Sequence, residues 1–441
     1  LGAMWIEPDG NLPSGESFVR QIVHGERYFK DAFGDTGPRR RLAYLPDTFG
    51  FAASLPQIFR LAGLDTIITN KLWWNETNEF PHTHFVWRGV DGAAVASHLT
   101  PGKEYNATNT PKELRLGQDV LLKKDALGVG AWLQPFGYGD GGGGPTDWTV
   151  LNAQIAANCL GLPETNLSGA AEFCRALHER RAALQAAGRD LPVWDGELYL
   201  ERHRGTYTTQ ADVKRGNVRA EADLRIAEWL SFAGPVPLLP AERAGAVSAL
   251  DVAWKKTLLN QFHDILPGSS IGEVYEDAAR DHEAVDSSCS DLISQGRARW
   301  SAHVDTTGMR EPVLVFNPGS SAGSGLVACG VGGAQRQCHV RDVPAMGIRV
   351  VDLAEPLPIE PATVRGRLLS NGIIEATIDE EGRISSLKRC GGRDLAGPGL
   401  SGAIEPINQL VLYGDRPRAW EAWDIEADYI DRAEPVSGPV P

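Results

Sequence analysis

The sequence has neither an excess of positive charge nor a long apolar run, and each absence excludes a class of protein. Lys and Arg number 43 against 57 Asp and Glu, which gives a net charge of -14. Phosphate backbones and anionic membranes repel such a chain, and we find no local basic patch that would bind nucleic acid. No apolar run approaches the roughly 20 residues of a membrane-spanning helix, and no segment resembles a signal peptide.

Paired cysteines are missing as well. The six cysteines are dispersed and form no C-x-x-C pair, so neither a disulfide framework nor a thiolate zinc site is indicated. Reduced thiols in the cytoplasm are the simplest interpretation. What the chain does have is 42% hydrophobic residues, enough for a sizeable core, which excludes global disorder. Its 441 residues indicate several domains, since one domain usually holds about 100 to 200.

The sequence pattern changes twice along the chain, which divides it into three regions. Residues 1–205 alternate short apolar strands with amphipathic helices, which predicts an α/β domain. Residues 206–305 contain three long helical patterns separated by GPVPLLP and ILPGSS, which predict a three-helix bundle. In residues 306–441 Gly, Pro and alternating Val and Ile predict a sandwich-like β domain that is cut short. The opening without an initiator Met predicts a piece of a longer protein.

Several local predictions in the first region are specific. Residues 14–33 have apolar side chains at helical spacing behind Ser14, which can cap the helix. Residues 41–46 and 66–72 are predicted strands, and an Asp-Gly turn at 91–92 predicts a hairpin. Residues 130–136 are predicted as a further strand that ends in a glycine-rich loop.

Asp47 directly follows the predicted strand at 41–46 and precedes a helix. Active sites of α/β domains lie at the carboxyl ends of strands, and Phe49 and Phe51 could stack on the apolar faces of a sugar. Asp is also strongly favoured as a helix cap, and on position alone capping is the favoured interpretation.

Asp140 lies in a glycine-rich segment that allows three interpretations. Residues 137–142 match G-x-G-x-x-G, a dinucleotide-binding pattern, although an anionic Asp there would repel a pyrophosphate. The glycines also leave Asp140 as the only chemically active side chain of an adaptable loop, which suits a general acid. A flexible surface loop without chemistry is the third interpretation.

The histidines allow two metal hypotheses. His263 follows a long helix, where it could favour the helix dipole or bind a ligand. His82 and His84 alternate like a metal-binding pair, although their Pro-led loop favours solvated or supporting roles. The segment HRGTYTTQ, from His203 to Gln210, is polar and aromatic at the junction of two regions, where ligand clefts tend to form.

Six sequence blocks follow one another in a characteristic order: WIEPDGNLPSGES (5–17), LPDTFGFAASLPQI (45–58), NKLWWN (70–75), FGYGDGGGGPT (136–146), ERHRGTYTTQA (201–211) and NQFHDILPGSSIGEVYEDA (260–278). Together they resemble the class II α-mannosidases of glycoside hydrolase family 38, in particular the cytosolic-type branch and its bacterial relatives. The resemblance implies a seven-stranded parallel α/β barrel, here only in part, then a three-helix bundle and the start of a β-sandwich region.

The resemblance also implies roles for single residues. Asp47 takes the position of the nucleophile, which also binds zinc, Asp140 that of the general acid/base, and His263 that of a zinc ligand. Lys71 stands where other branches have Arg, and Asn106 where they have Asp. The predicted substrate-binding residues are Phe49, Lys71, Tyr105, Asn106, His203 and Tyr207.

The zinc site implied by the resemblance has four ligands, and the first two come from an N-terminal His-x-Asp motif followed by Trp. No such motif precedes Asp47 in this sequence. Zinc takes at least three protein ligands, so Asp47 and His263 alone do not make a stable site. We therefore predict a fragment that begins inside the barrel, with zinc or cobalt as the metal of the complete protein.

The predicted function is the retaining hydrolysis of terminal non-reducing α-D-mannose residues in oligosaccharides by a cytoplasmic enzyme. Asp47 would attack the anomeric carbon, and Asp140 would protonate the leaving oxygen and then activate water. Neither nucleic acid nor a membrane is expected as a partner, and self-association of the full-length protein is left open. The alternatives are a dinucleotide-dependent oxidoreductase, a metal-dependent polysaccharide deacetylase with His82 and His84 beside Asp47, and a non-catalytic carbohydrate-binding or inert fragment.

Overall fold

The chain forms two compact units in the computed structural model. The first comprises residues 1–228, 238–293 and 419–424, and the second comprises residues 229–237, 294–418 and 425–441. The structure describes residues 3–34, 41–102, 105–125, 127–140, 142–331, 334–354, 362–396 and 406–438.

A five-stranded sheet organises the first unit. In order across the sheet it contains β1 (Arg41–Tyr44), β2 (Leu64–Thr69), β4 (Ala94–Leu99), β3 (His84–Arg88) and β5 (Val193–Asp195). Strands β1, β2 and β4 are parallel to one another, whereas β3 is antiparallel to β4 and parallel to β5. The predicted strand at 41–46 and the hairpin are confirmed, whereas the strand predicted at 66–72 begins at Leu64 and ends at Thr69, before the short helix η1 (Lys71–Trp74). The sheet is mixed, however, and its closure into a seven-stranded barrel stays a prediction.

The predicted strand at 130–136 is wrong. Within this segment Phe136 alone makes a β-bridge, to Ala107. Gly130 has a left-handed φ of 67°, and Pro135 has no N–H for a strand ladder. Leu133 donates its N–H to the ring Nε2 of His98 at 3.1 Å instead of to a neighbouring strand. Turn geometry and a side-chain acceptor therefore replace the ladder.

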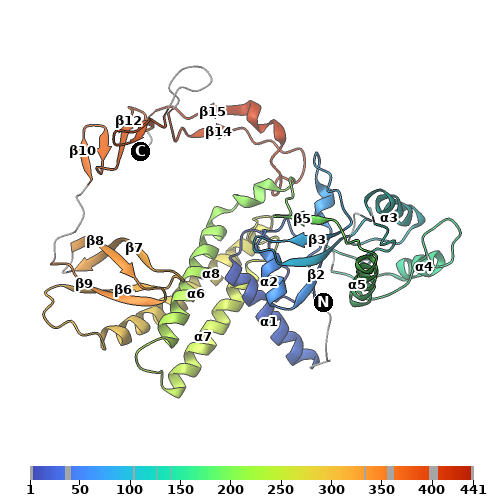
Figure 1. The fold of residues 1–441 in the computed structure, drawn as a ribbon, viewed down its shortest axis with the longest axis horizontal. Helices are drawn as coiled ribbons and strands as arrows, with labels where there is room; N and C mark the ends of the chain where they lie inside the picture. Colours follow the sequence, from blue (N-terminus) through green and yellow to red (C-terminus); the bar gives the residue numbers. More distant parts are fainter. Residues whose placement is uncertain are drawn as a thin grey trace. The chain divides into compact units, whose positions relative to one another are not determined.

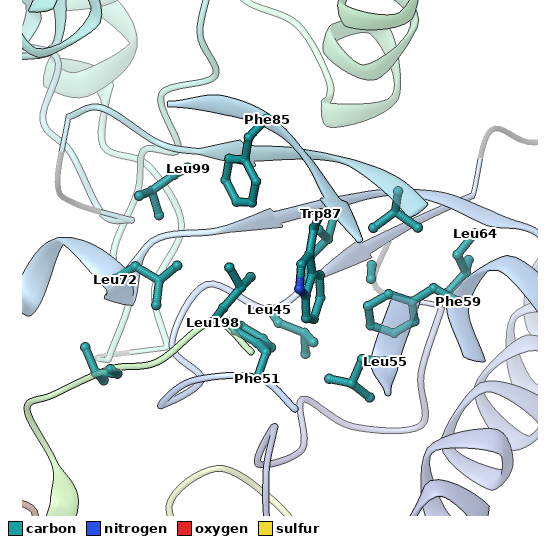
Figure 2. Packing of buried hydrophobic residues seen from close by; sticks show 14 of the residues in the cluster. Leu45, Phe51, Leu55, Phe59, Leu64, Leu72, Phe85, Trp87, Leu99 and Leu198 are labelled. Atoms are coloured by element: carbon teal, nitrogen blue, oxygen red, sulfur yellow. The ribbon is translucent and has the colours of Figure 1, made fainter. Parts of the chain in front are cut away.

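The two faces of the sheet bury different side chains, because successive residues of a strand point to opposite faces. Trp87 of β3 packs with the helix α2 (Leu55–Leu61) and the helix α1 (Gly15–Phe33), while its neighbour Val86 packs with α5 (Ala170–Ala186). Figure 2 shows Trp87 of the first of these cores beside Phe51 and Phe59. The sheet is therefore covered on both faces, as an α/β domain requires.

Helix α1 confirms the prediction for residues 14–33. Ser14 accepts a hydrogen bond from the Ser17 N–H, and the helix ends at Gly34 with φ 72°. Two further helices, α3 (Pro111–Lys124) and α4 (Asp147–Ala156), complete the α/β part of the chain. A capping box between Thr110 and Glu113 fixes the start of α3.

Three long helices follow, as predicted: α6 (Ala211–Phe232), α7 (Pro240–Leu259) and α8 (Gly272–Ser301) (Figure 1). Trp254 of α7 donates to Glu228 of α6 at 2.8 Å. Arg219 of α6 forms an ion pair with Asp286 of α8 at 3.0 Å. Each helix thus contacts another, although the bundle arrangement itself stays a prediction. Among the described residues, no helix is both long enough and apolar enough to cross a bilayer.

The second unit is rich in antiparallel strands, which confirms the predicted β character of this region. Strand β6 (Pro312–Asn317) pairs with β9 (Gly347–Asp352), and β7 (Gly323–Val331) pairs with β8 (Ala334–Val343). Their small core contains Val315, Cys338, Val340 and Val343. A separate sheet contains β10 (Thr363–Arg365), β11 (Leu368–Ser370), β12 (Ile374–Ile378) and β13 (Ile384–Arg389), and β14 (Val411–Tyr413) pairs with β15 (Ala433–Pro435).

Candidate active site

Three parallel strands deliver polar side chains to one edge of the sheet. Asp47 follows β1, Lys71 follows β2 within the short helix η1 (Lys71–Trp74), and Tyr105 follows β4. The carboxyl ends of parallel neighbours meet at the same edge, so residues from distant parts of the sequence converge there. Asp47 does not cap a helix: α2 begins only after Ser54, so the capping interpretation is wrong.

Asp47 is the centre of this cluster. Its Oδ1 lies 2.7 Å from Lys71 Nζ, and its Oδ2 lies 3.7 Å from His263 Nε2. The Tyr105 hydroxyl lies within 3.4 Å of the same Oδ2. Oδ1 is buried and accepts no well-aligned hydrogen bond from a described residue, so the Lys71 ammonium group is its neutralising partner. The Asp47 side chain is only 18% exposed, and each of its two carboxylate oxygens thus has a neighbouring polar group.

The Tyr105 hydroxyl also joins Asp47 to Asp140. Tyr105 Oη lies 3.1 Å from Asp140 Oδ1, and it can donate its single hydrogen to either carboxylate. Burial, followed by the charges of Asp47 and Asp140, raises the pKa of Tyr105, so the phenol stays a donor. The two predicted catalytic carboxyl groups therefore lie on either side of one hydroxyl.

Two glycines shape the loop that carries Asp140. Gly137 has φ 128°, which side chains rarely adopt, and a Cβ on Gly139 would lie 3.0 Å from the Tyr105 ring. The glycines thus permit a close approach to Tyr105. No strand leads into this loop and α4 begins only at Asp147, so the strand–turn–helix context of a dinucleotide site is absent from these described residues.

His263 lies beyond the end of α7. Its Nδ1 lies 2.9 Å from the carbonyl oxygen of Glu7, which can only accept, so Nδ1 donates its N–H there, and Nε2 is the ring nitrogen that faces Asp47. A backbone N–H from the same histidine donates to the same carbonyl at 3.2 Å. Such an orienting hydrogen bond is typical of histidines that bind metals.

The residues present fit two zinc ligands but not a complete zinc site. Asp47 offers a carboxylate oxygen, and His263 offers Nε2. The described part of the chain contains no group of three or more His, Cys, Asp or Glu residues placed to hold a metal ion. Zinc requires at least three protein ligands. Burial also raises the pKa of the nearby Glu7 carboxyl group, an effect that His263 opposes and Asp47 reinforces.

Aromatic rings surround the cluster. The centroid of the Phe49 ring lies 5.0 Å from that of His203 and 6.3 Å from that of His263. Lys71 Nζ lies 3.5 Å from the centroid of Trp74, a cation–π contact that the sequence analysis missed. Trp74 stands in the block NKLWWN, and its position three residues after Lys71, within one helical turn, was the available signal.

His203 and Tyr207 support Phe49 and do not contact Asp47 directly. Burial lowers the pKa of His203, while a hydrogen bond to Asp424 opposes that shift. Asn11 Nδ2 donates to the Phe49 carbonyl at 3.1 Å and lies 3.3 Å from Tyr207 Oη. Burial, with the charge of Asp9 next, raises the pKa of Tyr207 to about 12.

Asn106 lies beside the loop that carries Asp140. Its Cβ would be 3.2 Å from a Cβ built on Gly139. The structure thus brings Asp47, Lys71, Tyr105, Asp140 and His263 together, with Phe49 beside them, and leaves His203, Tyr207 and Asn106 around them.

His82 and His84, the other predicted metal-binding histidines, lie just before and at the start of strand β3 and contact other residues. His84 is 1% exposed, stacks on His98 at 4.7 Å between ring centroids, and lies 3.8 Å from Asp125. His82 packs against the rings of Phe80 and Phe85. These contacts leave the deacetylase hypothesis without the two histidines that it placed beside Asp47.

Comparison with known families decides between the remaining interpretations. Residues 1–197 match the glycosyl hydrolases family 38 N-terminal domain, and residues 201–299 match the alpha mannosidase middle domain. The chain belongs to glycosyl hydrolase family 38. Asp47, Lys71, Tyr105 and Asp140 lie in the segment that matches the family 38 N-terminal domain, and His263 lies in the segment that matches the middle domain.

Similar proteins agree with this family. The chain is 35% identical to human alpha-mannosidase 2C1 over 99% of its own length and 41% of that protein. It is 32% identical to the alpha-mannosidase of Saccharomyces cerevisiae over 100% of its own length and 38% of that protein. The chain thus spans about two fifths of the length of these curated relatives.

The fold has a solved counterpart. A crystal structure of an alpha-mannosidase from Enterococcus faecalis V583 superposes with a TM-score of 0.70 at 16% identity. The match covers 99% of this chain and 55% of that one. At this identity the likeness concerns the fold, and it agrees with a mixed α/β architecture with parallel strands.

Proposed function

We propose that the chain carries the catalytic centre of an α-mannosidase that removes terminal non-reducing α-D-mannose residues from oligosaccharides with retention of configuration. Membership of family 38 supports the reaction class. One observation carries the stereochemical part: a single hydroxyl, Tyr105 Oη, reaches both Asp47 and Asp140. Retaining glycosidases hold their carboxyl groups about 5 to 5.5 Å apart, whereas inverting enzymes need about 6.5 to 9.5 Å.

In the first step Asp47 attacks the anomeric carbon. A bond forms between the Asp47 oxygen and that carbon, the glycosidic bond breaks, and Asp140 gives its proton to the leaving oxygen. In the second step water gives a proton to Asp140 and attacks the same carbon, which releases mannose and restores Asp47.

The surroundings of the two carboxyl groups suit these different roles. Asp47 is held by Lys71 and Tyr105 and is largely shielded from water, as a nucleophile that must keep one orientation requires. Asp140 is exposed on its loop, where a leaving group of variable size can reach it. The structure therefore favours the attacking role for Asp47 and the proton-transfer role for Asp140.

Further roles follow from the contacts around Asp47. Lys71 neutralises and orients the nucleophile, and the buried ring of Phe49, which packs against His203 and His263, supports the residues around it. We propose zinc, or cobalt in its place, as the metal, with Asp47 and His263 as two ligands and the others outside the described residues. When bound, it would act as a Lewis acid on sugar hydroxyl groups.

The substrate class agrees with the charge of the chain. A net charge of -14 disfavours polyanionic ligands and suits a neutral mannose-containing oligosaccharide. A cytoplasmic location stays a prediction from the dispersed cysteines of the sequence, and self-association of the full-length protein stays a prediction as well.

The proposal is tested by hydrolysis of an aryl α-mannoside, with the anomer of the first-formed mannose observed by proton NMR. We expect α-mannose as the first product, loss of turnover in Asp47→Asn, and a larger defect of Asp140→Asn on oligosaccharides than on the activated aryl substrate. Asp119→Asn, on the exposed face of α3, is the matched control. First-formed β-mannose, or full activity of Asp47→Asn, would contradict the proposal.

A further inference from the structure

A short segment from late in the chain belongs to the unit that holds the active site. Residues Ala419–Asp424 lie in the first unit, although the residues before and after them belong to the second. This segment forms hydrogen bonds with His203 and Gly205. Asp424 Oδ1 accepts a hydrogen bond from the His203 N–H at 2.6 Å and lies 2.7 Å from His203 Nδ1. Gly205 donates its N–H to the Trp423 carbonyl at 2.8 Å.

Both ends of this charge-assisted contact are buried. Asp424 is 9% exposed and His203 is 3% exposed, so the contact is shielded from water. Arg202 Nε lies 3.4 Å from the other oxygen of Asp424. The segment is therefore fixed against the residues that support Phe49.

Within this segment the backbone holds one tryptophan ring in a defined place. Trp420 has φ 59°, which is uncommon for a bulky residue and persists only where the surroundings determine it. The N–H groups of Trp423 and Asp424 both donate to the Trp420 carbonyl at 2.8 Å. Even so, the side chain of Trp420 is 46% exposed. A fixed, half-exposed indole ring is available to stack on a ligand.

The Trp420 ring extends an aromatic wall that starts beside the nucleophile. Lys71 Nζ is 2.7 Å from Asp47 and 3.5 Å from the Trp74 centroid, and the Trp420 centroid lies a further 6.2 Å from that of Trp74. The two indole planes are inclined at 57°. Polar groups flank this wall: Arg202 forms an ion pair with Glu76 at 2.7 Å, and both side chains are partly exposed.

We propose that Trp74 and Trp420 bind the second sugar of the substrate, the pyranose to which the terminal mannose is attached. This inference rests on the proposed function. Hydrolysis at Asp47 removes a terminal residue, so every other sugar must lie on the leaving-group side, outward from Asp47. Indole rings stack on the apolar C–H face of a pyranose, and Arg202 and Glu76 offer a donor and an acceptor to its hydroxyl groups.

The test compares two substrates that share the mannosyl group but differ in the leaving group. α-Mannobiose places a pyranose on the wall, whereas α-mannosyl fluoride has no ring there. In the full-length protein we expect Trp420→Ala to lower kcat/KM for the disaccharide about tenfold more than for the fluoride, mainly through KM. Trp420→Phe, which keeps a ring, should recover most of the difference.

Controls distinguish binding from folding. Phe33→Ala removes a 65% exposed ring at the end of α1 and should leave the ratio of the two kcat/KM values unchanged. Turnover of the fluoride reports whether Trp420→Ala is folded. Equal losses on both substrates, or no loss on either, would overturn the second-sugar site. If the wild-type protein cleaves neither substrate, the proposed function itself fails.

Discussion

The ammonium group of Lys71 is the nearest cation to the proposed nucleophile. It lies 2.7 Å from Asp47 Oδ1, is 6% exposed, and has the Trp74 ring on another side. A buried cation and carboxylate each lose hydration, so each depends on the other for compensation. Asp47 has no other neutralising contact to Oδ1 among the described residues.

Replacing Lys71 by Met should therefore destabilise the protein as well as reduce turnover. Loss of one partner from a buried pair costs about 3 kcal/mol, and we expect a decrease of that order in the free energy of unfolding, measured by urea denaturation. Lys71→Arg keeps the charge and should lose much less. An unchanged midpoint for Lys71→Met would show that Lys71 does not neutralise Asp47.

Elements of secondary structure determine how close the catalytic groups come. Strands β1, β2 and β4 are parallel, so the residues after them share one edge of the sheet. The loop with Asp140 follows no strand, and it depends instead on the contact between Gly139 and the Tyr105 ring. Strand geometry thus positions Asp47, Lys71 and Tyr105, whereas a contact between its loop and the Tyr105 ring positions Asp140.

Gly139→Ala tests the contact made by this loop. A Cβ would lie 3.0 Å from the Tyr105 ring, so the ring or the loop must shift and the distance from Tyr105 to Asp140 should increase. We expect kcat for an α-mannoside to fall at least about tenfold, since a small misplacement of a catalytic group has a large effect. Gly144→Ala, in the same loop with nothing within 4 Å of its Cβ, is the control and should keep normal kcat. Equal rates for the two variants would contradict this role of Gly139.

The hairpin of β3 and β4 carries a separate, pH-dependent feature. His84 and His98 are directly opposite in the antiparallel register. Burial lowers the pKa of His84 to about 4, only partly offset by the charge of Asp125, and burial also lowers that of His98. Because both stay neutral in the folded state while the unfolded chain takes up protons below its usual pKa near 6.5, acid should favour unfolding.

We therefore expect the free energy of unfolding to fall as the pH decreases from about 6.5 to 4. The contribution of His84 between pH 7 and pH 5 is on the order of 2 kcal/mol. Urea unfolding at both pH values measures it. His84→Asn should show a smaller decrease than wild type, whereas the exposed His303→Gln should show the wild-type decrease. Identical decreases in His84→Asn and wild type would refute the assignment.

For the whole molecule, periodic sequence patterns predicted the helices well. Helices α1, α6, α7 and α8 repeat apolar residues over many turns, and the Asp-Gly turn predicted the β3–β4 hairpin. Asp47, Asp140 and His263 were predicted as a catalytic and metal-binding group from ordered sequence blocks, and the structure brings them together around Tyr105 and Lys71.

Other features depend on contacts that local patterns do not encode. The segment 130–136 has the composition of a strand, yet a left-handed Gly130, Pro135 and the ring of His98 prevent a ladder. Asp424 is 221 residues from His203 in the sequence, so nothing near either residue predicts their pairing. Contacts over such separations become visible only when the chain is folded.

The proposal on which the function of the whole molecule depends is that Asp47 becomes covalently attached to mannose. Incubation with a 5-fluoro mannosyl fluoride, followed by proteolysis and mass spectrometry, tests it most directly, because the electron-withdrawing fluorine slows release of the glycosyl-enzyme. We predict one label per active site, on the peptide that contains Asp47, and no label in Asp47→Asn. A label on another carboxylate, or unchanged labelling of Asp47→Asn, would contradict the account.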